Sequence, residues 1–202
     1  MTPEQSEHRV FLNRYYRAAR PIYDVTRKYY LFGRDRALNV LLAAPWSSLI
    51  EVGPGTGRNL EILQRRRAWA LYGGVEAADA MLERAAERCP WAHFQRAFAE
   101  DADYAAVLGA PPQRILFSYC LSMVQRRDEA LQQALASVAS GGEVHVVDFA
   151  DLAGLPGPLA AGLRAWLKMY RVQPLDPGWL AAHGAEMVFG PGRYYVLARW
   201  RR

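Results

Sequence analysis

Apolar and polar positions follow two alternating patterns through the middle of the chain. Five short apolar runs are typical of buried strands, and they lie at 47–52, 71–76, 92–97, 114–119 and 143–150. Between these runs, apolar residues recur at steps of three and four, as on one face of a helix, at 59–67, 79–88 and 127–140. Strands that alternate with helices predict βαβ units and a parallel sheet.

The two ends of the chain have different patterns. Residues 185–190 and 193–200 flank Pro191-Gly192 and predict an antiparallel hairpin. Residues 158–171 predict an inserted helix, and 4–43 have helical periodicity with many Tyr and Arg. We therefore predict an α/β fold with a mostly parallel seven-stranded sheet, a C-terminal antiparallel hairpin and helices on both faces.

The same pattern predicts one domain over residues 1–202, because no Gly/Ser linker or repeat divides the chain. Its expected parts are an N-terminal helical element at 1–43, a cofactor-binding core at 46–150, an inserted helix at 151–178 and a closing hairpin at 179–202.

Composition narrows the class of protein. With 51% hydrophobic and 22% charged residues, the chain is an ordinary globular one that can bury a core. No apolar run approaches the ~18 residues that a membrane span needs. No basic head precedes an apolar stretch, and the chain has only two cysteines, which favours a reducing cytoplasm. The net charge of +5 suits nucleic acid, anionic lipid or acidic metabolites, and does not choose among them.

A glycine-rich loop, EVGPGTG at 51–57, stands directly between a predicted strand and a predicted helix. Glycines there allow a tight turn and a close approach of the backbone to a ligand. Arg58 stands where a dinucleotide fingerprint needs its third glycine, and Arg58-Asn59 replaces the ending of a phosphate-binding loop. Glu76, at the end of the next strand, is placed to accept hydrogen bonds from a ribose diol.

Together, EVGPGTG, GGVEAADAML, the acidic AED at 99–101 and FSYCLSM at 117–123 resemble the class I S-adenosylmethionine-dependent methyltransferases over residues 46–150. The resemblance implies a Rossmann-like fold and S-adenosyl-L-methionine as the cofactor. The cofactor-binding residues that it implies are Glu51, Gly53, Gly55, Thr56, Gly57, Asn59, Glu76, Ala77, Met81, Ala99, Glu100 and Ser118.

The family's pattern also assigns roles within that set. The three glycines would surround the methionine and ribose parts, and Glu76 the ribose hydroxyls. Met81, Ala99 and Glu100 would lie at the adenine, with Ser118 near the methionine.

One position departs from the family. Many members have Gly-Asp-Ala after the third strand, where the aspartate reads the adenine amino group, whereas this chain has Phe98 at the position of the aspartate. A phenyl ring cannot accept that hydrogen bond, so Glu100 and Asp101 are the candidate replacements.

A closer resemblance concerns the methyl acceptor. The strings PIYDVTRKYYLFGRDRAL (21–38), FSYCLSM (117–123) and GGEVHVVDFADLAGLP (141–156) resemble the bacterial betaine-lipid N-methyltransferases. That family methylates the amino group of diacylglyceryl-homoserine three times, and the phosphatidylethanolamine N-methyltransferases are near relatives. The resemblance implies a lipid-headgroup partner and a peripheral position at the inner face of the membrane.

The residues suit such a reaction, because aromatic faces attract a cationic nitrogen and guanidinium groups bind carboxylate or phosphate. The expected catalytic residues are Tyr23, Tyr30 and Tyr119, and the expected substrate-binding residues are Tyr16, Arg27 and Arg34. The basic helices at 4–43 and 158–171 either lie on a bilayer or form a lid over the site.

Other functions stay open at this point. The acceptor is alternatively phosphatidylethanolamine or a soluble small-molecule amine, and a cofactor-binding protein without catalysis is a third hypothesis. A nucleic-acid partner is disfavoured, since the Asn/Asp-Pro-Pro-aromatic motif of many base-methylating enzymes is absent after the fourth strand. The four histidines lack metal-ligand spacing, so no metal site is expected.

Overall fold

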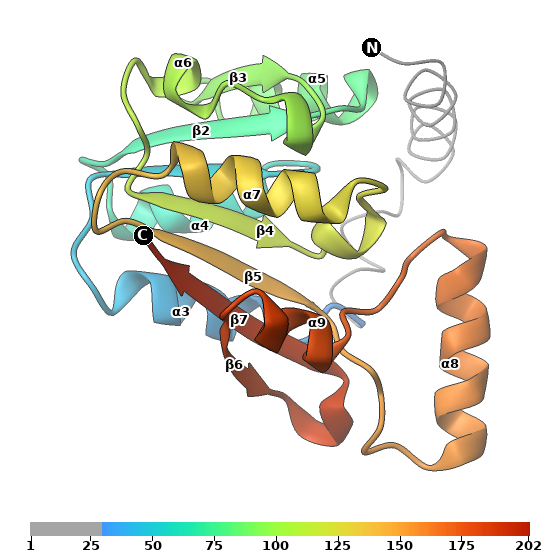
Figure 1. Ribbon diagram of the computed structural model, residues 1–202. Coiled ribbons are helices and arrows are strands. Elements are labelled where there is room, and N and C mark those ends of the chain that lie inside the picture. The colour runs from blue at the N-terminus through green and yellow to red at the C-terminus, as the bar shows by residue number, and fades with distance from the viewer. Residues whose placement is uncertain (1–29) are drawn as a thin grey trace.

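The computed structural model describes residues 30–202, which contain a seven-stranded sheet. Its strands are β1 (Ser48–Val52), β2 (Leu71–Glu76), β3 (His93–Arg96), β4 (Arg114–Ser118), β5 (Glu143–Phe149), β6 (Glu186–Phe189) and β7 (Tyr195–Arg201). They lie in the order β3-β2-β1-β4-β5-β7-β6 (Figure 1). The first five strands pair in parallel, and β7 runs antiparallel to both β5 and β6.

Helices connect the strands and cover both faces of the sheet. They are α3 (Arg34–Leu42), α4 (Arg58–Arg66), α5 (Asp79–Arg88), α6 (Tyr104–Leu108), α7 (Arg127–Ser137), α8 (Gly157–Met169) and α9 (Pro177–Ala182). Short 3-10 turns are η1 (Ala99–Asp101), η2 (Leu121–Met123) and η3 (Pro191–Arg193). In Figure 1, α7 lies in front of the sheet and α3 and α4 lie behind it. The predicted α/β fold with its C-terminal antiparallel hairpin is confirmed.

The core explains why the strands are continuous apolar runs. Leu49 of β1 belongs to a buried cluster with Leu41 of α3 and Leu60 of α4. Its neighbour Ile50 faces the other side of the sheet, in a cluster with Leu131 of α7. Because helices bury both faces, successive strand residues are apolar on both sides, as in other parallel sheets.

The predicted boundaries differ from the observed ones at a few places. The helix predicted at 127–140 ends at Ser137, because Val138 takes an extended backbone with ψ of 146°. Helices α6 and α9 are too short for their periodicity to be seen in the sequence. Of the helical region predicted at 4–43, the structure describes the part from residue 30 onward, where α3 lies, and the rest falls outside the described residues.

The parallel strands place the functional motifs at one edge. The glycine loop follows β1 and Ser118 ends β4, and these two strands are neighbours. The chain leaves β1 toward β2 on one side, whereas β4 lies on the other, so this is the switch point where ligands bind in such sheets. In Figure 1, α8 stands on the side toward which these strands point. Over residues 30–202, none of the helices has the length and apolar character needed to cross a membrane.

Candidate active site

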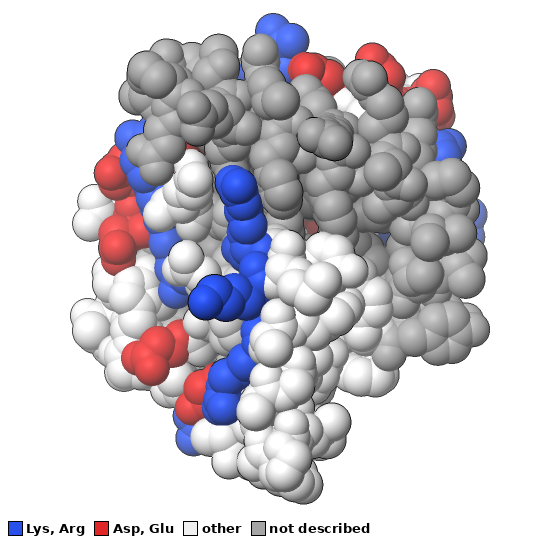
Figure 2. All heavy atoms as spheres, turned by 90° about the vertical axis from the view of Figure 1, so that its right-hand side faces the viewer, with Lys and Arg blue, Asp and Glu red and all other residues white. Residues whose placement is uncertain are grey.

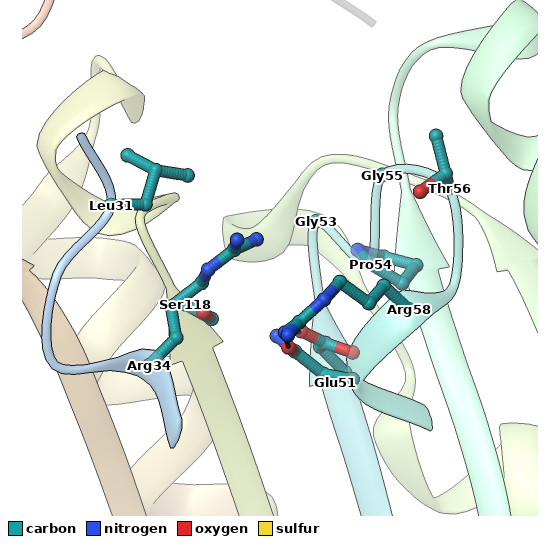
Figure 3. A pocket seen from close by; sticks show the side chains of 10 residues that line it. Leu31, Arg34, Glu51, Gly53, Pro54, Gly55, Thr56, Arg58 and Ser118 are labelled. Atoms are coloured by element: carbon teal, nitrogen blue, oxygen red, sulfur yellow. Dashed lines mark hydrogen bonds between the residues drawn. The ribbon is translucent and has the colours of Figure 1, made fainter. Parts of the chain in front are cut away.

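A pocket lies at the carboxyl ends of β1 and β4, between the start of α3 and the glycine loop (Figure 3). Seven of the predicted site residues line it, namely Arg34, Glu51, Gly53, Gly55, Thr56, Asn59 and Ser118. Leu31, Pro54 and Arg58 complete the lining. Residues far apart in the sequence therefore meet at one edge of the sheet, where β1 and β4 end.

The glycine loop has a backbone that favours glycine. Gly53, Gly55 and Gly57 all have positive φ, at 64°, 58° and 79°, a region that side chains with a Cβ rarely adopt. A Cβ on Gly53 would also lie 2.6 Å from the Sγ of Cys120, which is too close. The loop thus keeps its backbone open toward the pocket.

The buried acidic group of the pocket is the carboxyl of Glu51. The Nδ2 of Asn59, in the first turn of α4, donates to its Oε1 at 2.7 Å. Burial raises the pKa of Glu51 to about 7, although the hydrogen bond from Asn59 and the charge of Arg34 act in the opposite direction. The carboxyl group is therefore poised between its protonated and ionised forms near neutral pH.

Two buried oxygen atoms in the pocket lack a partner. The second oxygen of Glu51, Oε2, and the Oγ of Ser118 accept no hydrogen bond from any residue in the described part of the chain. Buried polar atoms without a partner call for an explanation, and within a pocket a bound ligand or water is one. A carboxylate and a hydroxyl that both await a donor fit the α-ammonium of the methionine part of S-adenosylmethionine, so the residues present suit that cofactor.

Glu76 joins the end of β2 to the glycine loop. Its Oε1 accepts from the backbone N–H of Ala78 at 3.0 Å, and its Oε2 accepts from that of Gly55 at 3.3 Å. Ala77, which lies between Glu76 and Ala78 in the sequence, is half-buried. The carboxylate of Glu76 therefore lies at the glycine loop, where its oxygens are of the kind that accept hydrogen bonds from ribose hydroxyls.

The predicted adenine contacts lie in separate elements. Met81 is buried in the first part of α5, and Ala99 is buried in η1. Glu100 pairs with Arg126, whose Nε lies 3.2 Å from its Oε1, and Asp101 pairs with the same guanidinium. The two candidate replacements for the missing aspartate are thus engaged with one arginine.

Two guanidinium groups give the pocket positive charge. Arg34 enters from the start of α3 and Arg58 from the start of α4, and they lie on opposite sides of the opening in Figure 3. Asp35 pairs with Arg58 at 3.3 Å and so connects the two helix starts. The arrangement can bind the anionic part of a ligand, because guanidinium groups hold carboxylates well.

The predicted tyrosines occupy different places. Tyr30 is half-buried, and its ring meets that of Trp166 edge-on, with centroids 5.2 Å apart. Tyr119 is buried, its ring packs on Phe149, and its hydroxyl donates to the carbonyl of Phe32. Tyr16, Tyr23 and Arg27 lie outside the described residues. The roles expected for all of these remain predictions.

Sequence reasoning missed Leu31, Pro54 and Arg58. Pro54 and Arg58 lie within or directly after the glycine loop, so their position was a usable signal. Leu31 carries no such signal, because only the packing of the segment before α3 brings it to the pocket. Among residues 30–202, no cluster of three or more His, Cys, Asp or Glu side chains is arranged to hold a metal ion.

Comparison of the sequence with known proteins finds matches to methyltransferases. The family described as "Methyltransferase domain" matches residues 22–177. A trans-aconitate 2-methyltransferase of Paracidovorax citrulli is 30% identical over 113 residues, a match that covers 54% of this chain and 43% of that relative. This chain therefore matches less than half the length of that relative.

Solved structures share the fold. The plantazolicin methyltransferase BpumL, in complex with a monoazolic desmethylPZN analogue and SAH, has a TM-score of 0.67 at 13% identity, covering 98% of this chain and 96% of that one. A methyltransferase of Thermotoga maritima described as a possible histamine N-methyltransferase has a TM-score of 0.64 at 16% identity, with coverage of 92% and 99%. At these identities the likeness concerns the fold alone.

Proposed function

The chain belongs to the methyltransferase domain family, and from that premise we propose that this class I S-adenosylmethionine-dependent enzyme methylates the amino nitrogen of a lipid headgroup at a membrane surface. The favoured acceptor is diacylglyceryl-homoserine, which would become the trimethylated betaine lipid. The observation that carries this proposal is the surface of α8 beside the pocket.

The chain's own residues bind and orient the reactants. Glu51 and Ser118 supply acceptors for the cofactor's ammonium group, and Glu76 supplies them for its ribose. The bound cofactor supplies a methyl group on a sulfonium sulfur, and the acceptor nitrogen takes it with its lone pair and gives up a proton. Such in-line transfer depends mainly on alignment, so a strong general base is unnecessary when an uncharged amine enters.

Helix α8 exposes both apolar and cationic side chains. Its sequence, GPLAAGLRAWLKM, contains no acidic residue. Leu159 is 58% exposed and Met169 is 75% exposed, whereas Leu167 faces the core. Arg164 and Lys168 are exposed on the same helix. Apolar side chains beside cations are the features of a helix that lies in the interface of an anionic bilayer.

The position of α8 links this surface to the pocket. This side of the molecule faces the viewer in Figure 2, where a band of Lys and Arg runs beside uncharged surface. Trp166 of α8 contacts Tyr30, which directly precedes the pocket residue Leu31. The ring of Tyr170 also meets that of Trp166 edge-on, with centroids 5.0 Å apart. A headgroup at the bilayer surface would thus meet aromatic rings before it reaches the pocket, and such rings stabilise a cationic nitrogen by ~0.5–2 kcal/mol each.

Arg34 supports the choice of headgroup. Its guanidinium lines the pocket, where it would pair with the homoserine carboxylate or with a lipid phosphate. The expected contributions of Tyr16, Tyr23 and Arg27 belong to the same proposal and lie outside the described residues.

The acceptor is tested by measuring release of S-adenosylhomocysteine with four acceptors in parallel: diacylglyceryl-homoserine and phosphatidylethanolamine in mixed micelles, soluble homoserine, and trans-aconitate. We expect turnover with diacylglyceryl-homoserine. Turnover with phosphatidylethanolamine alone would make that lipid the acceptor in place of diacylglyceryl-homoserine. Turnover only with a soluble acceptor would overturn the lipid proposal.

The membrane surface is tested by sedimentation with phosphatidylglycerol vesicles. We expect the double variant Leu159→Glu, Met169→Glu to lose most of its vesicle binding, because it places two negative charges on the face that meets the lipid. The matched control is Val188→Glu on the edge strand β6, a residue that is 51% exposed and lies on another element. Equal binding by the two variants would contradict a role for α8.

A second candidate function is methylation of a small polycarboxylate. Two observations favour it: a relative is a trans-aconitate 2-methyltransferase, and two arginines line the pocket. The trans-aconitate arm of the same experiment decides between the two candidates. In that case α8 would form a lid rather than a membrane contact.

A further inference from the structure

The residues just before α3 form a short segment that three tyrosines contact. We call residues 30–33 the strap, because they lead from Tyr30 to the glycine that begins α3. The hydroxyl of Tyr194 donates to the carbonyl oxygen of Tyr30 at 2.9 Å. The hydroxyl of Tyr119 donates to the carbonyl oxygen of Phe32. A third tyrosine, Tyr195, packs its ring against Gly33.

The contact between Tyr195 and the strap leaves no room for a side chain. Gly33 has φ of 83°, and a Cβ on it would lie 2.5 Å from the Cε2 of Tyr195. The same ring also leaves no room for a Cβ on Gly190, the residue that follows β6. The ring is therefore fixed between two glycines, and the start of α3 is fixed with it.

Tyr119 connects the end of β4 to the strap. It directly follows Ser118 on β4, and its backbone N–H donates to the carbonyl oxygen of Val147 at 2.8 Å. Its φ of 54° lies in the left-handed region, which is costly for a bulky residue and is retained where the surrounding structure demands it. That backbone conformation accompanies the bond from its hydroxyl to Phe32, two residues before Arg34.

The strap in turn supplies one wall of the pocket. Leu31 lies within it and Arg34 follows it directly, and both line the pocket opposite Glu51. The fixed strap presents these two side chains in place before a ligand arrives. Preorganisation of this kind raises affinity, because the ordering cost is not incurred on binding.

We propose that Tyr119, Tyr194 and Tyr195 are positioning residues that hold the strap so that Leu31 and Arg34 form the wall of the cofactor pocket. For Tyr119 this is a different role from direct contact with a cationic substrate. The two roles are separable, since Tyr119→Phe keeps the aromatic face and removes only the hydroxyl.

The test is calorimetric titration of the full chain with S-adenosylhomocysteine. We expect Tyr119→Phe and Tyr194→Phe each to raise Kd about fivefold, the effect of one hydrogen bond of ordinary strength. The matched control is Tyr72→Phe, because Tyr72 also donates to a backbone carbonyl, that of Arg67 at 3.0 Å, at the other end of the sheet. We expect the control to change Kd less than twofold.

A double-mutant cycle separates positioning from general loosening of the fold. In an Arg34→Gln background, Tyr119→Phe should raise Kd by a smaller factor than in the natural chain, since one of the two side chains that the strap positions has been changed. An equal effect in both backgrounds, or no effect of either tyrosine variant on Kd, would overturn the proposal. If Tyr119→Phe is poorly folded, the same cycle is run with Tyr194→Phe. This test measures cofactor affinity, whereas the proposed methyl acceptor is tested by turnover. Failure of one proposal can therefore be distinguished from failure of the other.

Discussion

At the scale of single residues, burial of Glu51 in the pocket lowers the stability of the fold, and we propose that the same carboxyl binds the cofactor. Its carboxyl is buried, and burial raises its pKa to about 7. A group whose pKa is higher in the folded than in the unfolded chain favours folding at low pH, and this contribution is lost as pH rises through about 7. The ionised form, however, is the one that attracts a cofactor ammonium.

Replacing Glu51 by Gln should therefore stabilise the protein and weaken the binding of its cofactor. From a shift of 4.5 to about 7, we expect ~3 kcal/mol more unfolding free energy at pH 8 and less than ~1 kcal/mol at pH 5. Urea denaturation at the two pH values measures this difference. A variant less stable than the natural protein at pH 8 would contradict it.

The same residue predicts the pH dependence of cofactor binding. We expect the affinity for S-adenosylhomocysteine to fall as pH drops below about 7, because Glu51 then becomes protonated. The Glu51→Gln variant should bind more weakly at pH 8 and lose that pH dependence. Calorimetric titration between pH 5.5 and 8.5 measures both effects.

Gly53 offers a second prediction at this scale. Gly53→Ala should weaken cofactor binding more than tenfold, because it strains the loop and brings a Cβ toward Cys120. Gly109→Ala is the control, since Gly109 has a similar φ of 75° and a Cβ there meets nothing within 4 Å. Gly109→Ala should lose ~1 kcal/mol of stability from its positive φ alone, and Gly53→Ala should lose more, because its Cβ also meets Cys120. Equal cofactor affinities would contradict the close contact at Gly53.

At the scale of elements, helix α9 depends on its first residues. Asp176 precedes the helix and its carboxylate accepts from the backbone N–H of Trp179 at 2.9 Å, while Pro177 occupies the first turn. Leu180 within this short helix is fully buried. An N-cap Asp followed by Pro is a known helix start, and six residues are too few for stability without it.

Loss of that cap should be measurable. We expect Asp176→Ala to reduce the unfolding free energy by ~1 kcal/mol, and Asp176→Asn to change it by only a few tenths, since Asn caps helices as well as Asp. Thermal denaturation of both variants compares them. Equal losses in the two would show that charge at this position matters more than the cap.

At the scale of the whole molecule, an ionic network joins the strands at the edge opposite the pocket. Glu143 begins β5, and Arg201 of β7 donates to its carboxylate at 2.8 Å. Arg114 of β4 lies 3.3 Å away and His145 hydrogen-bonds at 3.0 Å. Burial acts against ionisation, but the bonds from Arg201 and His145 outweigh it and lower the pKa of Glu143. One carboxylate thus connects three neighbouring strands.

The Glu143→Gln variant should therefore lose stability while it keeps its affinity for the cofactor. It leaves the buried guanidinium of Arg114 without its counter-charge, so we expect a loss of ~3 kcal/mol in unfolding free energy at pH 7. The loss should shrink in acid, because Glu143 stabilises the fold only while ionised and the contribution disappears as pH falls through its lowered pKa. Affinity for S-adenosylhomocysteine, measured on the folded variant, should stay within twofold. A large change in that affinity would show that the two edges of the sheet are coupled.

The sequence by itself determined the alternating α/β fold and indicated the glycine loop as one side of the pocket. Buried strands appear as apolar runs, and the glycine loop is a strand, a turn and a helix start within a few consecutive residues. Glu51, Gly53 and Ser118 were indicated by the resemblance of EVGPGTG and FSYCLSM to the methyltransferase family. The structure brings them to one pocket because parallel strands have their carboxyl ends at one edge.

Only the tertiary structure decided what forms the opposite wall of the pocket. Tyr194 bonds to Tyr30, which lies 164 residues earlier in the chain, and Tyr195 fits against Gly33. No periodicity or spacing encodes such pairs, since each tyrosine alone fits a core position equally well. The pairs exist because the antiparallel β7 lies beside β5, next to the segment that precedes α3, and that placement is a property of the folded chain rather than of any local stretch.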